Sequence, residues 1–106
     1  MATHSTLRNS LAERAKNIMR RELQVYADRT KGSQSATARA RTVMPMGVPS
    51  SFQYYDPHPI VVRRAQAAWM EDVDGNRYID YDMGFGALFA GHCHPAVKEA
   101  VERQLE

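Results

Sequence analysis

The chain is poor in cysteine and has no long apolar run. Its single cysteine, Cys93, excludes an internal disulfide framework and is typical of a reducing compartment, so we expect a cytoplasmic protein. No apolar run approaches the roughly 20 residues that a helix needs to cross a membrane. The opening residues lack the apolar centre of a signal peptide. These absences predict a protein that works away from membranes.

Aromatic residues are nearly missing from the first part of the chain, which is also its basic part. Residues 1–44 hold nine Lys or Arg and three Asp or Glu, whereas residues 45–106 hold five and nine. A basic segment can bind nucleic acid. However, Tyr26 is the only aromatic residue of the basic part, which leaves little for stacking on bases. We therefore expect a solvated helix face and no nucleic-acid partner; the alternative is a weak nucleic-acid binder.

Apolar residues recur at helical spacing through the basic part and predict an amphipathic helix from about residue 10 to 29. Ser10 and Glu13 fit a capping box at its start, and Gly32 follows its end. We expect residues 1–9 to fray. The apolar stripe of this helix consists of Leu7, Leu11, Ala15, Ile18, Met19, Leu23 and Tyr26.

A second, shorter helix is predicted from Ser33 or Ser35 to about residue 43, because either serine can cap a helix and proline follows. We therefore divide the chain into two units. Residues 1–32 form a basic amphipathic helical extension, and residues 33–106 form the main segment.

Three short β-prone runs follow: Ile60–Val62, Ala67–Glu71 and Tyr78–Tyr81. The Asp74-Gly75-Asn76 turn joins the last two, and turn residues also separate the first two. Together they predict a small antiparallel meander. A helix is expected from Pro95 to the last residue, since proline suits the first helical position. The fold class is therefore α+β.

The connection between the second helix and the first strand, residues 48–59, is rich in proline and serine and predicts a loop. Phe52, Tyr54 and Tyr55 are unusually apolar for an exposed loop. Either they cover an edge of the core, or they line a substrate pocket.

Two motifs invite a metal interpretation, and neither supports one. His92-Cys93-His94 offers metal-ligating side chains, but no second pair of ligands accompanies it, and zinc needs three or four that converge. We expect these histidines to make hydrogen bonds and to cap the following helix. The acidic run that starts at Asp72 is similar to a calcium loop, but its sixth and twelfth positions hold Arg77 and Met83 in place of glycine and glutamate.

Three spaced blocks of the sequence resemble the class III aminotransferases. Residues 72–80 and 91–97 match the family's Asp-Gly-Asn block and its Gly-His-x-His-Pro block. Residues 44–48 resemble the Met-Pro-Gly-Gly-Val turn of the glutamate-1-semialdehyde aminomutase branch, with Met46 in place of one glycine. The resemblance extends from about residue 35 to residue 106.

This resemblance implies the opening part of a pyridoxal phosphate (PLP) enzyme with the α/β architecture of fold type I. Such an enzyme moves an amino group between a small-molecule amino donor and a carbonyl acceptor, and it is a homodimer. PLP chemistry needs a buried lysine. Lys16, Lys31 and Lys98 do not have such a setting, and the family's reaction centre lies further along the chain. We therefore expect no catalytic residue here, no covalent bond to PLP, and no activity of this chain alone.

The resemblance also implies two substrate contacts. Gln53 occupies the position of an arginine that pairs with a substrate carboxylate in the aminomutase branch, and Phe85 matches an aromatic residue that faces the site. The competing interpretation of Phe85 is ordinary core packing. The competing interpretation of the whole chain is a non-catalytic protein that binds a partner through the apolar stripe of its first helix.

Overall fold

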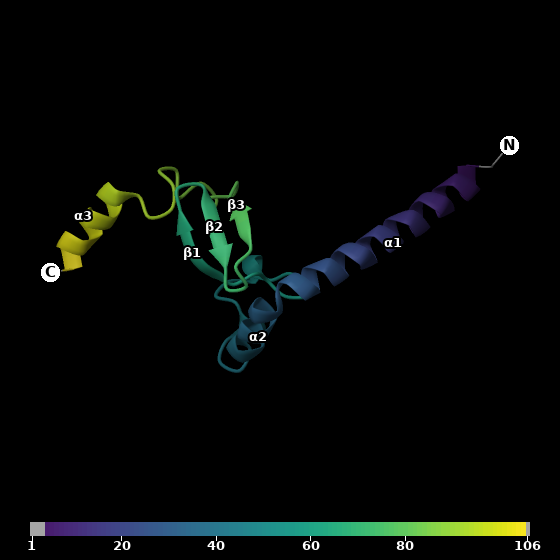
Figure 1. The fold of residues 1–106 in the computed structure, drawn as a ribbon, viewed down its shortest axis with the longest axis horizontal. Helices are drawn as coiled ribbons and strands as arrows, with labels where there is room; N and C mark the ends of the chain where they lie inside the picture. The colour runs from purple at the N-terminus through teal and green to yellow at the C-terminus, as the bar shows by residue number, and fades with distance from the viewer. Residues whose placement is uncertain (1–3, 106) are drawn as a thin grey trace.

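The computed structural model describes residues 4–105, and the side chains of residues 8–105. It has three helices, two short 3-10 turns and a three-stranded sheet (Figure 1). In chain order these are α1 (His4–Arg29), α2 (Lys31–Ala40), η1 (Pro45–Gly47), η2 (Ser51–Gln53), β1 (Val62–Gln66), β2 (Trp69–Asp72), β3 (Arg77–Ile79) and α3 (Pro95–Leu105).

Helix α1 projects from the rest of the molecule and gives it a longest dimension of 73 Å (Figure 1). Its predicted end at residue 29 is confirmed, but it begins earlier than predicted, at His4. Ser10 therefore lies inside the helix and does not cap it, and residues 4–9, where fraying is expected, are helical in the structure. Residues 1–3 and the side chain of Leu7 lie outside the part that the structure describes.

Most of the α1 stripe faces solvent. Leu11, Ile18, Met19 and Leu23 are between 46% and 65% exposed. Only the end of the helix that is nearest the sheet docks on the rest of the chain. There the Tyr26 hydroxyl donates to the carbonyl of His58 at 2.6 Å.

Helix α2 starts directly after Thr30 and not at Ser33 or Ser35, so the predicted serine caps are wrong. The reason is a partner from far along the chain. The carboxylate of Asp74 accepts hydrogen bonds from the backbone N–H groups of Gly32 and Ser33 and from the Ser33 hydroxyl. The predicted division of the chain between residues 32 and 33 stays a prediction. The residues on either side of it, Gly32 and Ser33, both donate hydrogen bonds to Asp74.

The sheet is an antiparallel meander in the order β1-β2-β3, which confirms the predicted topology (Figure 1). Its first strand is shifted relative to the prediction, since it begins only at Val62. The backbone N–H of Ile60 donates to the Tyr55 hydroxyl, and that of Val61 donates to the Ser33 hydroxyl. These two residues therefore satisfy their amides outside the sheet. With the helices, the meander gives the α+β arrangement expected.

Helix α3 begins at Pro95 as predicted, and Glu106 lies outside the described residues. Its apolar side chains Val97, Val101 and Leu105 are 53% to 82% exposed. None of the helices over residues 4–105 combines the length and apolarity of a membrane crossing.

Buried residues gather where α2 meets the turn between β2 and β3, and most of them are polar. Val48 and Pro59 are the buried apolar residues among those with described side chains. The buried polar residues are Thr30, Ser33, Thr37, His58, Glu71 and Asp72.

Candidate functional site

Asp72 is the centre of the turn between β2 and β3. Its carboxylate is fully buried and accepts from the N–H groups of Asp74 and Asn76 at 3.0 and 2.8 Å. It also accepts from the Asn76 side-chain amide at 2.9 Å and from the Tyr78 hydroxyl at 2.8 Å. Burial alone would raise the pKa of Asp72, but the hydrogen bonds from Asn76 and Tyr78 outweigh it and lower the pKa. Gly75 completes the turn with φ +85°.

The same turn binds the junction of α1 and α2. Asp74 holds the start of α2, and Asn76 both accepts from the Arg29 guanidinium and donates to the Arg29 carbonyl. Burial would raise the pKa of Asp74, but the N–H groups of Gly32 and Ser33 more than offset it and lower the pKa. The oxygens that a calcium loop would use are therefore engaged with protein donors.

The loop after β3 contains Gly84, Gly86 and Gly91. Asp80 forms hydrogen bonds near the start of this loop and to His92 near its end. One carboxylate oxygen of Asp80 accepts from the N–H groups of Asp82 and Met83, at 2.9 and 2.8 Å. The other oxygen lies 2.6 Å from His92 Nε2. The hydrogen bonds from Met83 and then from His92 lower the pKa of Asp80. His92 therefore makes the expected hydrogen bond, whereas His94 is exposed.

The far end of this loop is packed against the connection between β1 and β2. Ala67 and His92 exchange two backbone hydrogen bonds, of 3.0 and 2.8 Å. Gly91 lies so close to Ala67 that a Cβ would stand 3.1 Å from the Ala67 Cα. Another segment of the chain therefore approaches the backbone closely at Gly91, while a Cβ at Gly86 would meet open space.

A hollow of about 900 Å³ lies between α2, the 3-10 turns and the sheet. Gln53 and Tyr55 line one part of it, and Asp80 and Asp82 line another. Phe85 does not line this hollow, and its side chain is 83% exposed. The structure thus places the two predicted substrate contacts on neighbouring but separate surfaces. The loop aromatics divide as well, because Tyr55 lines the hollow while Phe52 is 86% exposed.

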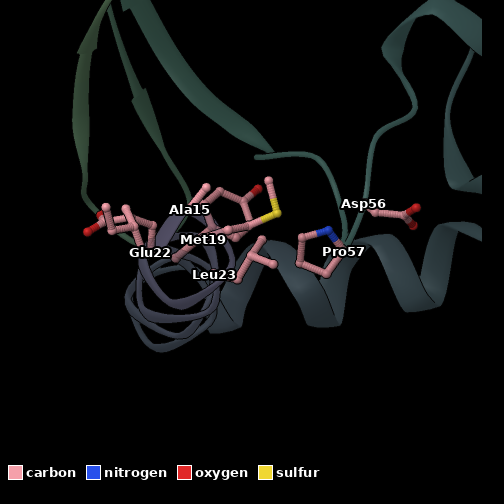
Figure 2. A pocket seen from close by; sticks show the side chains of 8 residues that line it. Ala15, Met19, Glu22, Leu23, Asp56 and Pro57 are labelled. Atoms are coloured by element: carbon pink, nitrogen blue, oxygen red, sulfur yellow. The ribbon is translucent and has the colours of Figure 1, made fainter. Parts of the chain in front are cut away.

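A second groove, of about 610 Å³, runs along α1 and is almost entirely apolar in its lining. Met19 and Leu23 lie beside Pro57 there, with Asp56 and Glu22 at the rims (Figure 2). Besides these two carboxylates, its polar groups include the Tyr26 hydroxyl, which already donates to the His58 carbonyl. Its character is that of a packing surface.

The described residues show no cluster of metal-ligating side chains, and the three lysines are all exposed. No three His, Cys, Asp or Glu side chains within the described part converge on one point. Lys31 is exposed, and Lys16 and Lys98 are exposed and paired with glutamates at 3.5 Å. None of the three has the buried setting expected of a lysine that forms a Schiff base.

Residues 51–106 match the family model described as Aminotransferase class-III. The chain belongs to this family. A glutamate-1-semialdehyde 2,1-aminomutase of Chloroflexus aurantiacus is 45% identical over 87 residues, which are 79% of this chain and 20% of that protein. The chain therefore spans about a fifth of the length of the curated relatives it matches.

Solved structures show the same likeness. A glutamate-1-semialdehyde aminomutase from Pseudomonas aeruginosa PAO1 has a TM-score of 0.81 and 30% identity, over 89% of this chain and 21% of that one. A transaminase solved with PLP bound has a TM-score of 0.68 and 37% identity, over 72% of this chain and 18% of that one. PLP is the cofactor of the family, as expected.

Sequence reasoning singled out the acidic turn and the two histidines but missed what Asp72, Asp74 and Asp80 do. A local signal was available, because aspartate side chains accept from backbone amides two residues further along in Asx turns. Asp72 with Asp74, and Asp80 with Asp82, have that spacing. The partners from α2 and from His92 carry no such signal.

Proposed function

We propose that this chain is the amino-terminal part of a PLP-dependent aminotransferase or aminomutase similar to glutamate-1-semialdehyde 2,1-aminomutase. The complete enzyme moves an amino group on a small amino acid or amine, with a carbonyl compound as acceptor. The observation that carries this proposal is the match of residues 51–106 to the family, supported by the likeness of the fold to a solved aminomutase. PLP supplies the electron sink when it is bound.

Within that enzyme, we assign this chain to substrate binding and not to catalysis. Gln53 faces the hollow beside α2, where its amide can donate to or accept from a substrate group. Phe85 presents an exposed ring on the loop after β3, suited to cover an apolar part of the substrate. The exposed lysines support the further proposal that the chain alone is inactive.

We further propose that the complete enzyme is a cytoplasmic homodimer. The single thiol supports a reducing compartment. The exposed apolar stripe on α1 supports the proposal that another protein surface covers it, because contiguous exposed apolar patches mark interaction sites.

The proposed function is tested by comparing the complete enzyme with the 106-residue chain. Both are supplied with PLP, an amino donor and a carbonyl acceptor, and amino transfer is measured. We expect transfer by the complete enzyme and none by the chain. Borohydride reduction of the chain with PLP, followed by mass spectrometry, should give only scattered, low labelling. One stoichiometric adduct on a single lysine would contradict the assignment of the reaction centre to the rest of the enzyme.

The role of Gln53 is tested by Gln53→Arg in the complete enzyme. An arginine–carboxylate pair exceeds a neutral hydrogen bond by roughly 1–2 kcal/mol, which is about a tenfold effect on selectivity. We expect kcat/KM to rise for amino acids that carry an α-carboxylate and to change little for amines without one. Gln66→Arg, which adds the same charge on exposed β1, is the control. Equal changes for both substrate classes would show that position 53 does not face the carboxylate.

A further inference from the structure

The loop between β3 and α3 has a backbone that must be held in place. Met83, Gly84, Phe85 and Gly86 follow one another with φ between +49° and +83°. Glycine adopts this left-handed conformation freely, but residues with a Cβ do so at a cost. Two of the four are not glycine, so the loop keeps this shape only because other contacts fix it.

Those contacts start at one carboxylate. Asp80 accepts from the N–H groups of Asp82 and Met83, and the Asp82 carboxylate in turn accepts from the Phe85 N–H at 3.1 Å. Asp80 is itself fixed at the end of the sheet, where its N–H donates to the Ala68 carbonyl at 2.9 Å. The chain of hydrogen bonds therefore leads from the sheet to the backbone of Phe85.

His92 secures this chain from the other end of the loop. Its Nε2 lies 2.6 Å from the second oxygen of Asp80, and both side chains are largely buried, with 19% and 11% exposed. Its backbone is paired with Ala67, in the connection between β1 and β2. The Asp80–His92 pair thus joins the first residue of the loop that presents Phe85 to a residue near its end, while Phe85 itself is exposed.

We propose that Asp80 and His92 are positioning residues that fix the loop so that Phe85 meets the substrate. This proposal rests on the proposed function. It adds to that function the two residues that orient the ring of Phe85 toward the substrate. Neither residue touches substrate in this proposal. Both act through the backbone of the loop, so their effect is on substrate binding more than on the chemical step.

The first arm of the test uses the 106-residue chain and amide hydrogen exchange. Glutamine can place its amide nitrogen near the position of Nε2, whereas leucine cannot donate at all. In His92→Leu we expect the amides of Met83 and Phe85 to exchange at least about tenfold faster, and in His92→Gln we expect a change of less than about threefold. His94→Leu, at the exposed histidine nearby, is the control. The Asn76 amide, held by Asp72, reports that the fold is intact.

The second arm uses the complete enzyme. His92→Leu should raise KM for the amino donor by roughly threefold to tenfold with little change in kcat. In an enzyme that already carries Phe85→Ala, His92→Leu should have no further effect on KM. Unchanged exchange in His92→Leu would overturn the proposal, and so would a KM effect of the same size without Phe85. A complete enzyme without amino transfer would overturn the proposed function and the substrate role of the loop. The exchange result on the chain would still show whether the pair holds the loop.

Discussion

Asp72 combines complete burial with a negative charge, and its four hydrogen bonds make that combination stable. A buried carboxylate without partners would be protonated, because removal from water disfavours the ion. Here two backbone N–H groups, one amide and one hydroxyl surround it. The consequence appears in its neighbour as well. Burial, followed by the hydrogen bond to Asp72 and the charge of Asp72, raises the pKa of Tyr78 to about 12.

We predict that Asp72→Asn lowers the pKa of Tyr78. Ionised Tyr78 would place a second negative charge beside the carboxylate, so removing that charge makes ionisation easier. Burial, the larger cause, remains, and the pKa should stay above its ordinary value of 10.0. Tyrosinate absorbance is titrated in the wild type and the variant, with Tyr78→Phe to identify the signal among five tyrosines. Asp82→Asn is the control, and an unchanged curve would contradict the prediction.

At the scale of elements, the turn between β2 and β3 also acts as the cap of α2. Helix N-termini need acceptors for their free N–H groups, and the residue before the helix usually provides one. The Thr30 hydroxyl instead donates back to the Tyr26 carbonyl, and Asp74 provides the acceptor from 41 residues away. The charge of Asp74 also suits the positive end of the helix dipole.

We predict that Asp74→Ala loosens the start of α2 by about 1 kcal/mol, the usual effect of removing a cap. The amides of Gly32 and Ser33 should exchange roughly fivefold faster. Asp74→Asn should have a smaller effect, since it keeps an acceptor but loses the charge. Asp28→Ala, at an exposed aspartate on α1, is the matched control. Equal exchange in Asp74→Ala and Asp28→Ala would show that the carboxylate does not cap the helix.

The elements also show where sequence reasoning works. The meander was predictable because Asp74-Gly75-Asn76 specifies its turn locally. The start of β1 was not, because the Val61 amide is taken by a hydroxyl 28 residues away. The start of α2 was also predicted too late in the chain, because a distant side chain, Asp74, accepts from the N–H groups of its first turn. In the candidate site, Gln53 and Phe85 came from a family resemblance, whereas the pairing of Asp80 with His92 needed three-dimensional structure.

At the scale of the whole molecule, the described part has little apolar core of its own. Val48 and Pro59 are its buried apolar residues, while large apolar side chains on α1 and α3 face solvent. Hydrogen bonds between buried polar groups make a modest net contribution to stability, and apolar burial makes the largest. The polar junction around Asp72 and Asp74 can therefore fix local geometry, but it does not provide a large free energy of folding.

This contrast leads to a prediction about α1. A helix that buries no apolar face is marginal in water, even at 26 residues, because packing supplies most helical stability in proteins. In the 106-residue chain at low concentration, the amides of residues 8–22 should therefore exchange nearly freely. Those of Ser33 and Asn76, held by Asp74 and Asp72, should be the better protected. In the complete enzyme, where we expect the stripe to be covered, residues 8–22 should become protected as well.

The stripe itself is tested by the double substitution of Ile18 and Met19 to serine. In the complete enzyme each truncation of a covered apolar side chain should cost about 2–4 kcal/mol of stability, whereas in the isolated chain the loss should be much smaller because both side chains are already exposed. Arg14→Ser with Arg21→Ser, on exposed positions of the same helix, is the control. Urea unfolding followed by circular dichroism measures the stability of both forms.

The exchange experiment on α1 has a contradicting outcome of its own. Strong protection of the α1 amides in the isolated chain would contradict the prediction if it did not depend on concentration. Protection that increases with concentration would mean instead that α1 is covered by a second copy.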